Sequence, residues 1–265
     1  MNTPQILVTG GTGVLGRRVV DRLHAAGVEA RVLSHSRKPG TTHGDLLTGE
    51  GLEPAVQGID TIIHCASSPY RKARGVDVEG TGRLLGAATR AGVSHTVYIS
   101  IVGIDLAASY PYYRVKLDTE RVVEDSPIPY TILRATQFYD LVLMALHFLD
   151  RLPVMPMPKG FFGQPIDAGE VADRLVEIVR SGPAGRVPDI GGPEVSTLSG
   201  AARTYLKVAG LRRRIFEVPV PGKTARAFRD GALLCPENAY GEIRWEDFLR
   251  SRFETPWHAA QRAAR

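Results

Sequence analysis

A glycine-rich turn near the start of the chain constrains the fold more than any other feature. The segment TGGTGVLG, residues 9–16, follows a short apolar run typical of a buried strand and opens a helical pattern over residues 14–26. Gly10 suits a tight turn, Gly13 suits the approach of backbone N–H groups to a pyrophosphate, and Gly16 suits close packing of the helix. The helix N-terminus adds partial positive charge. This order predicts a dinucleotide-binding unit, and a purely structural turn is the alternative.

Strand-like and helix-like segments alternate along the first half of the chain. The apolar runs typical of strands cover residues 28–33, 59–65, 95–101 and 129–134. Helical patterns cover residues 76–91 and the stretch from Pro111 to Glu124. Alternation with short connections predicts the α/β class, a Rossmann-like doubly wound parallel sheet with helices on both faces.

The character of the chain changes after about residue 135. Residues 136–150 are typical of a strongly apolar helix, whereas residues 151–166 are rich in Pro, Met and Phe and cannot form a regular helix. We expect a single domain over residues 1–265, with a small C-terminal substrate lobe from residues 136–168 and 191–265. The Pro- and Met-rich segment is either a hydrophobic loop packed on the core or the lining of an apolar substrate pocket.

Charge and composition exclude several classes of partner. The net charge is +5, but the densest arginine cluster, residues 212–214, is only three long and no nucleic-acid-binding pattern stands out, so we expect no nucleic-acid partner. Two cysteines without metal-ligand spacing predict neither a disulfide scaffold nor a metal site. The longest apolar run, Leu141 to Leu146, is too short to cross a bilayer, and the N-terminus does not resemble a signal peptide. We expect a cytoplasmic monomer or homodimer that does not bind membranes.

Short motifs in a fixed order carry a family resemblance. After the glycine turn come Gly-Asp-Leu at 44–46, DTIIHCA at 60–66, VDVEGT at 76–81 and YTILR at 130–134. Further landmarks are QPID at 164–167, GGPE at 191–194 and WEDFL at 245–249. The chain resembles the extended and atypical short-chain dehydrogenase/reductases, and in particular their NmrA-like subgroup, over essentially its whole length. Asp77 stands where the family commonly has Asn.

The resemblance implies a nicotinamide dinucleotide cofactor and its contacts. It places Asp45 near the adenine and the His-x-Ala strand end beside the cofactor. The expected cofactor-binding residues are Gly10, Thr12, Gly13, Val14, Leu15, Gly16, Ser34, Arg37, Lys38, Asp45, Leu46, Ala66, Ser67 and Lys116.

The end of the second strand bears on the choice between NAD and NADP. NAD-binding proteins usually place an acidic residue there, on the ribose 2′-hydroxyl. This chain has no acid between Arg31 and Gly40, and it offers Ser34, Arg37 and Lys38 instead. Hydroxyl and cationic groups suit a 2′-phosphate, so the sequence predicts NADP (NADPH). A solvated basic loop is the alternative.

Tyr112 and Lys116 form a Y-x-x-x-K pair near the start of a predicted helix, where both side chains share one face. A nearby ammonium favours the phenolate and should lower the tyrosine pKa. In the resembled family this pair is catalytic, with a serine as third member. Ser100 is the candidate here, but Ile101 and Val102 follow it where the family commonly has further serines.

Together these features predict an NADPH-dependent oxidoreductase that reduces a small, largely apolar carbonyl, quinone or enone. The substrate is expected over the nicotinamide, between the helix of Tyr112 and the residues after 135. Two alternatives remain open. One is a non-catalytic NADP-sensing regulatory protein of the NmrA type, and the other is a nucleotide-sugar epimerase-like enzyme.

Overall fold

The protein forms two compact units, described in a computed structural model that covers residues 5–69 and 72–253. The first unit consists of Met1–Ala135 and Ala168–Asp189, and the second of Thr136–Asp167 and Ile190–Arg265. Residues 1–4, 70–71 and 254–265 lie outside the described residues. The N-terminal segment that does not resemble a signal peptide begins within these residues, and the predicted substrate lobe ends within them.

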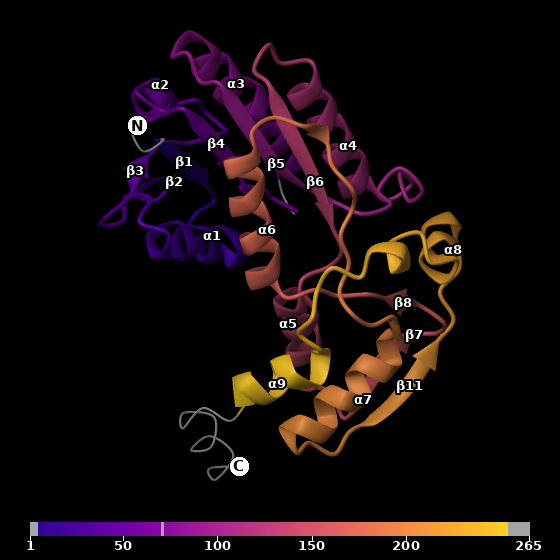
Figure 1. Cartoon of the computed structure of the whole chain (residues 1–265). Helices are drawn as coiled ribbons and strands as arrows, with labels where there is room; N and C mark the ends of the chain where they lie inside the picture. Colours follow the sequence, from indigo (N-terminus) through magenta and orange to yellow (C-terminus); the bar gives the residue numbers. More distant parts are fainter. Residues whose placement is uncertain (1–4, 70–71, 254–265) are drawn as a thin grey trace. The chain divides into compact units, whose positions relative to one another are not determined.

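The first unit is built on a seven-stranded parallel sheet with the strand order β3-β2-β1-β4-β5-β6-β9 (Figure 1). The strands are β1 (Ile6–Thr9), β2 (Ala30–Ser34), β3 (Thr42–His43), β4 (Thr61–His64), β5 (His95–Ile101), β6 (Tyr130–Ala135) and β9 (Gly185–Arg186). The chain runs outward from β1 through β3 and then returns to the other side of β1 at β4. This order confirms the predicted Rossmann-like doubly wound sheet and creates a switch point between β1 and β4.

Helices cover the sheet because each has one apolar face. The helices of this unit are α1 (Val14–Ala25), α2 (Leu52–Val56), α3 (Gly80–Arg90), α4 (Pro111–Glu124) and α6 (Ala168–Ser181). Helix α1 packs against α6, and α3 packs against both α2 and α4. The buried residues of α1, Leu15, Val19 and Leu23, recur with helical spacing. A π-helical turn, Arg74–Glu79, leads into α3.

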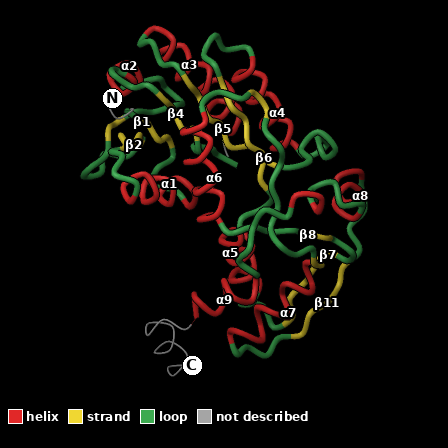
Figure 2. The backbone as a smooth tube through the Cα atoms, viewed as in Figure 1, coloured by secondary structure: helices red, strands yellow, loops and turns green. Residues whose placement is uncertain are grey.

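The second unit has its own apolar core, set between its helices and short strands (Figure 2). Its elements are α5 (Tyr139–Leu149), β7 (Val154–Pro158), β8 (Phe162–Gly163), β10 (Ser196–Thr197), α7 (Leu198–Ala209), β11 (Arg214–Val218), α8 (Lys223–Arg229), a 3₁₀ turn (Pro236–Asn238) and α9 (Trp245–Phe253). Met155 and Met157 on β7 are buried in this core. The Pro- and Met-rich segment is therefore non-helical, as predicted, and these two side chains are packing residues.

Helix α5 is the most apolar helix of the chain but has only 11 residues. Across residues 5–69 and 72–253, no helix combines the length and hydropathy needed to cross a membrane.

Candidate active site

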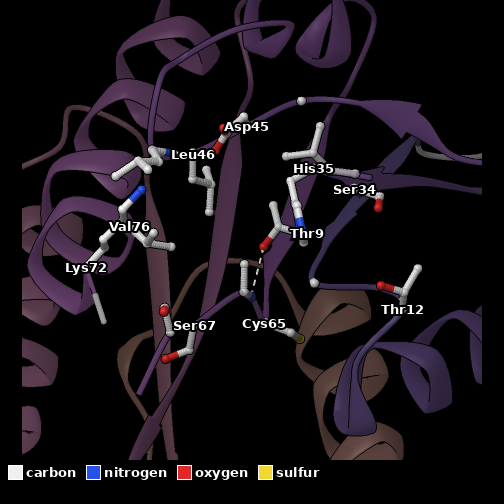
Figure 3. A pocket seen from close by; sticks show the side chains of 16 residues that line it. Thr9, Thr12, Ser34, His35, Asp45, Leu46, Cys65, Ser67, Lys72 and Val76 are labelled. Carbon is white, nitrogen blue, oxygen red and sulfur yellow. Dashed lines mark hydrogen bonds between the residues drawn. The ribbon is translucent and has the colours of Figure 1, made fainter. Parts of the chain in front are cut away.

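A cavity of about 460 Å³ opens where β1, β2 and β4 end at the switch point (Figure 3). Doubly wound parallel sheets bind ligands at this edge, because the connections that follow the two neighbouring strands run to opposite faces of the sheet and leave a crevice between them. The walls come from residues that follow each of the three strands and from the start of the π-helical turn. The lining residues are Thr9, Gly10, Thr12, Leu33, Ser34, His35, Gly44, Asp45, Leu46, Leu47, Cys65, Ala66, Ser67, Ser68, Lys72 and Val76.

The glycine turn closes one side of this cavity with bare backbone. Gly10 has φ +64°, and a Cβ there would lie 2.8 Å from backbone atoms of Ala66. A Cβ on Gly16 would overlap the carbonyl oxygen of Gly10. Gly13 occupies the N-cap position of α1 and offers no capping side chain. The first N–H groups of α1 therefore remain available to an anion, and the turn fits a dinucleotide pyrophosphate.

Half of the predicted cofactor residues line the cavity. They are Gly10, Thr12, Ser34, Asp45, Leu46, Ala66 and Ser67. The other seven, Gly13, Val14, Leu15, Gly16, Arg37, Lys38 and Lys116, are not among its lining residues. Leu15 and Gly16 are buried on α1, so any contact that they make with a ligand is through their backbone N–H groups.

Arg37 is turned toward a carboxylate in this structure. Its side chain is 79% exposed, and Nη2 lies 3.7 Å from Oε1 of Glu50. The same carboxylate oxygen lies 3.3 Å from His43 Nε2. An exposed pair of this kind contributes about 0–1 kcal/mol, so Arg37 is free to exchange Glu50 for a stronger anion.

Two basic residues of the lining are not among the predicted cofactor-binding residues. His35 follows Ser34 at the end of β2, and Lys72 stands at the opposite wall, before the π-helical turn. Lys72 has φ +66°, the left-handed region that disfavours residues with a Cβ. No pattern of apolar residues signals such a position, since its backbone angle depends on the turn around it. Among the described residues no cluster of three or more potential metal ligands occurs.

A hydrogen-bonded chain under the cavity fixes the state of His64. Ala66 N–H donates to Thr9 Oγ1 at 3.1 Å, and this bond is the dashed line in Figure 3. The Thr9 hydroxyl then faces His64 Nδ1 at 2.6 Å, while Nε2 lies 2.8 Å from Thr81 Oγ1. Thr81 in turn donates to the carbonyl oxygen of Asp77. The only consistent set of donors makes His64 neutral with its proton on Nε2.

Burial, aided by the charge of Lys116, lowers the pKa of His64 to about 3. The imidazole is therefore neutral, and its two hydrogen bonds join β1 to α3 beneath the cavity. Burial also raises the pKa of the neighbouring Cys65 thiol to about 12, which keeps it inert as a nucleophile.

Tyr112 reaches the cavity wall through Ser67. Its hydroxyl lies 2.5 Å from Ser67 Oγ, and Ser67 Oγ donates to Asp77 Oδ2 at 2.7 Å. Ser68 N–H donates to the other carboxylate oxygen at 2.8 Å. Because Ser67 has a single hydroxyl proton and gives it to Asp77, Tyr112 must donate its own proton to Ser67.

Lys116 lies one helical turn beyond Tyr112 on α4 and is only 4% exposed. Its Nζ donates to the backbone oxygen of Ile99 at 3.1 Å and sits 4.3 Å from the centre of the Tyr98 ring. Burial lowers the pKa of Lys116 to about 8, against the raising effect of Asp77 and Glu120. A buried amine with a pKa near neutrality is typical of functional lysines.

The predicted effect of Lys116 on Tyr112 is not found. Burial, with a smaller contribution from the Asp77 carboxylate, raises the pKa of Tyr112 to about 12. The reason is distance, because the ammonium faces Tyr98 and Ile99 while the carboxylate lies one hydroxyl away from the phenol. Tyr112 is therefore held as a neutral phenol in this state.

Ser100 does not join the pair. It lies on β5, is 3% exposed, and its Oγ has no hydrogen-bond partner among the described residues. Ser67 is the hydroxyl that contacts Tyr112 instead. The contact joins residues 45 positions apart in the chain, so no local motif could have predicted it.

Helix α4 is held in place by a buried ion pair. Arg134 on β6 donates from Nε and Nη2 to the two oxygens of Glu120, at 2.8 and 2.6 Å. Its Nη1 donates to Asp105 at 2.8 Å. The Arg134 and Glu120 side chains are 3% and 6% exposed. This bidentate contact fixes the position and orientation of α4, which carries Tyr112 and Lys116, relative to β6.

Comparison with known proteins agrees with this site. The profile of the family described as NAD(P)H-binding matches residues 10–181, which include the glycine turn, α4 and α6. The chain belongs to this NAD(P)H-binding family. This family agrees with the nicotinamide dinucleotide binding expected from the resemblance, and a short-chain dehydrogenase/reductase superfamily protein of Agrobacterium tumefaciens with bound NAD shares the fold over 98% of both chains, at 19% identity and a TM-score of 0.73.

The relatives that this chain matches include both an assembly factor and a reductase. The photosystem II assembly factor Ycf39 of Trieres chinensis is 30% identical over 57% of this chain and 51% of its own length. The chain thus spans about half the length of the assembly-factor relatives that it matches. A (4-alkanoyl-5-oxo-2,5-dihydrofuran-3-yl)methyl phosphate reductase of Streptomyces griseus is 27% identical over 81% of this chain and 77% of its own.

Among solved structures, the NADPH-dependent quinone oxidoreductase QOR2 of Escherichia coli, complexed with NADPH, matches with a TM-score of 0.77. The match covers 94% of this chain and all of that one, at 20% identity. At that identity the likeness is one of fold.

Proposed function

We propose that this protein is an NADPH-dependent reductase of small, largely apolar carbonyl, quinone or enone substrates. The observation that carries the proposal is the contact between Tyr112 and Ser67. Ser67 lines the dinucleotide cavity, and the Tyr112 hydroxyl lies 2.5 Å from it. A potential proton donor therefore borders the cavity on the side of β4, away from the β2 end where the adenosine half would lie.

The residues of the chain have separable roles in this proposal. The glycine turn and the start of α1 bind the pyrophosphate, and Ser34, Arg37 and Lys38 favour the 2′-phosphate. When bound, reduced nicotinamide supplies a hydride. Tyr112 then donates a proton to the substrate oxygen, and Lys116, one helical turn further along α4, is a cofactor-binding residue. The high pKa of Tyr112 suits this direction, because the residue enters the reaction as a phenol.

The test is turnover by a Tyr112→Phe variant on a panel of carbonyls, quinones and enones. Removing the hydroxyl keeps the ring and its packing, so NADPH binding and thermal stability should change little. Turnover should fall by about 10²- to 10⁴-fold, the usual contribution of a positioned acid. Tyr110→Phe is the matched control, because that ring is exposed and its hydroxyl is not part of the contact with Ser67. Retention of most activity by Tyr112→Phe would exclude Tyr112 as the acid.

A second candidate function is supported by the assembly-factor relatives. They match 57% and 51% of this chain, and the chain also matches the NAD(P)H-binding family, which together are compatible with a protein that binds NADP and regulates a partner without turnover. NADPH consumption across the same panel distinguishes the two functions. Tight NADPH binding without consumption of any substrate would favour the regulatory role.

A further inference from the structure

The carboxylate of Asp77 is buried at the inner end of the Tyr112–Ser67 contact, and it has no ion-pair partner among residues 5–69 and 72–253. It is 2% exposed and accepts hydrogen bonds from Ser67 Oγ and Ser68 N–H. Burying an ionised carboxylate costs free energy unless the charge is paired and hydrogen-bonded. The side chains that face it are Ser67 after β4, Tyr112 and Lys116 on α4, and Tyr98 on β5.

The direction of the hydrogen bonds depends on the proton of Asp77. With Asp77 ionised, Ser67 donates to the carboxylate and Tyr112 donates to Ser67, so the phenol proton points away from any substrate. With Asp77 protonated, the carboxyl group donates to Ser67, and Ser67 can donate to the Tyr112 oxygen. The phenol proton is then free to turn toward a substrate oxygen.

We propose that Ser67 and Asp77 form a proton relay behind Tyr112, in which protonated Asp77 sets Tyr112 as the acid and replaces the proton that it gives away. This inference rests on the proposed reductase function. Substrate carbon accepts the hydride from reduced nicotinamide, and substrate oxygen takes the Tyr112 proton. Ser67 passes its proton to the Tyr112 oxygen and receives that of Asp77, which is left as a carboxylate. Water entering after product release returns one proton to Asp77.

Two features of the structure suit this role. Burial raises the pKa of Asp77, so the carboxyl group keeps its proton to a higher pH than an exposed aspartate does. The relay is also short, since each donor and acceptor is already within 2.7 Å of the next. Asp77 is a positioning and proton-supplying residue here, and Tyr112 alone touches the substrate.

Asp77→Asn is the sharpest test, because the amide can donate to Ser67 but cannot ionise. Wild-type kcat/KM should fall about tenfold per pH unit above the Asp77 pKa. The variant should lack this limb and should turn over more slowly than the wild type at low pH, because the amide cannot replace the proton that Tyr112 gives away. If the carboxylate acted only through its charge on Lys116, its removal would lower the Lys116 pKa and move the alkaline limb downward instead. The relay therefore predicts that the alkaline limb of the pH profile disappears, whereas a role through charge alone predicts that it moves to lower pH.

Ser67→Ala interrupts the relay but leaves Asp77 with Ser68 N–H. It should abolish the same limb and lower kcat by about 10- to 150-fold, the loss expected when a hydrogen bond to a charged group is removed. The combined Ser67→Ala and Asp77→Asn variant should lose no more than Ser67→Ala alone. Asp118→Asn is the charge-matched control on α4, since that carboxylate binds Arg74 and Arg121 outside the relay.

A readout that needs no turnover comes from ¹³C-tyrosine NMR of the free protein, with the Tyr112 signal assigned by its loss in Tyr112→Phe. The Tyr112 pKa should fall in Asp77→Asn, because a nearby negative charge is removed and a donor is gained. An unchanged pH profile in Asp77→Asn, together with an inactive Tyr112→Phe, would refute the relay and leave the reductase proposal standing. Activity in Tyr112→Phe would instead overturn the acid on which both proposals depend.

Discussion

Gly13 is the N-cap residue of α1 and has extended backbone, with φ −82° and ψ −175°. Any residue can adopt these angles, so the backbone conformation does not require glycine at this position. A Cβ there would meet only the carbonyl oxygen of Gly10, at 3.1 Å, which a small local shift relieves. Gly13 is thus separable from Gly10 and Gly16, where a side chain would collide with backbone.

The matched variants Gly13→Asp and Gly13→Asn test the pyrophosphate site. Both residues are good N-caps, so both proteins should fold. The aspartate places a negative charge against the phosphates, and like charges about 4 Å apart repel by about 4 kcal/mol at an effective dielectric of 20. NADPH affinity should fall at least 10²-fold in Gly13→Asp and much less in Gly13→Asn, as measured by calorimetry. Equal losses in the two variants would contradict a phosphate contact at this turn.

Variants of Arg37 and of its partner Glu50 test the predicted preference for NADPH over NADH. Arg37→Ala should weaken NADPH binding about 10- to 150-fold and leave NADH binding nearly unchanged, because only NADPH carries the 2′-phosphate. Glu50→Gln should not weaken NADPH binding, since it only releases Arg37 from its present partner. Equal loss of both cofactors in Arg37→Ala would show that Arg37 does not contact the 2′-phosphate.

At the level of elements, the sequence predicted strands and helices best where neighbouring residues all favour the same secondary structure. The strand at residues 95–101 and the helix from Pro111 to Glu124 have the predicted bounds. The periodic apolar residues and the proline at the first helical turn carry this information locally. The pairing of β7 with β11 was not predicted, because it joins distant segments, and the prolines at 156 and 158 obscure the strand pattern.

The site was predicted only in part, for a related reason. The glycine turn and the Y-x-x-x-K spacing are local motifs, and they identified the cavity wall and the pair on α4. The link from Tyr112 to Ser67 and Asp77 depends on how α4 lies beside β4 and the π-helical turn. Lys116 likewise faces Tyr98 and Ile99 on β5 rather than the phenol. These orientations are set by tertiary packing.

The buried pair of Arg134 and Glu120 tests what holds α4 in that orientation. Arg134→Met removes one partner and leaves Glu120 ionised in the core, which should lower the free energy of unfolding by about 3–5 kcal/mol. The double variant Arg134→Met with Glu120→Leu should recover much of this loss, because no charge is then stranded. The control Arg22→Met breaks a contact with Asp173 whose side chains are 45% and 46% exposed, and it should cost less than about 1 kcal/mol. Urea unfolding measures all three, and similar losses for Arg134→Met and Arg22→Met would contradict the buried role.

For the whole molecule, the function proposed for Lys116 is opposed to stability. The ammonium is buried, and its pKa lies at about 8 against an ordinary value of 10.5. Below pH 8 both the folded and unfolded chains carry the proton, so the folded state bears the full cost of burying the charge. That cost is on the order of 3 kcal/mol. Between pH 8 and 10.5 the folded protein loses the proton first, and the cost is relieved.

Lys116→Met should therefore raise the free energy of unfolding at pH 7, by roughly 1–3 kcal/mol after loss of the bond to Ile99 and the contact with the Tyr98 ring. The advantage over wild type should shrink as the pH rises from 8 to 10.5. Turnover should fall in the same variant, because the proposed cofactor-binding ammonium is gone. Lys38→Met is the control, since that lysine is exposed and its removal should leave stability unchanged. Urea unfolding at several pH values measures the difference, and a variant less stable than wild type at pH 7 would show that Lys116 is a structural residue rather than one retained for catalysis.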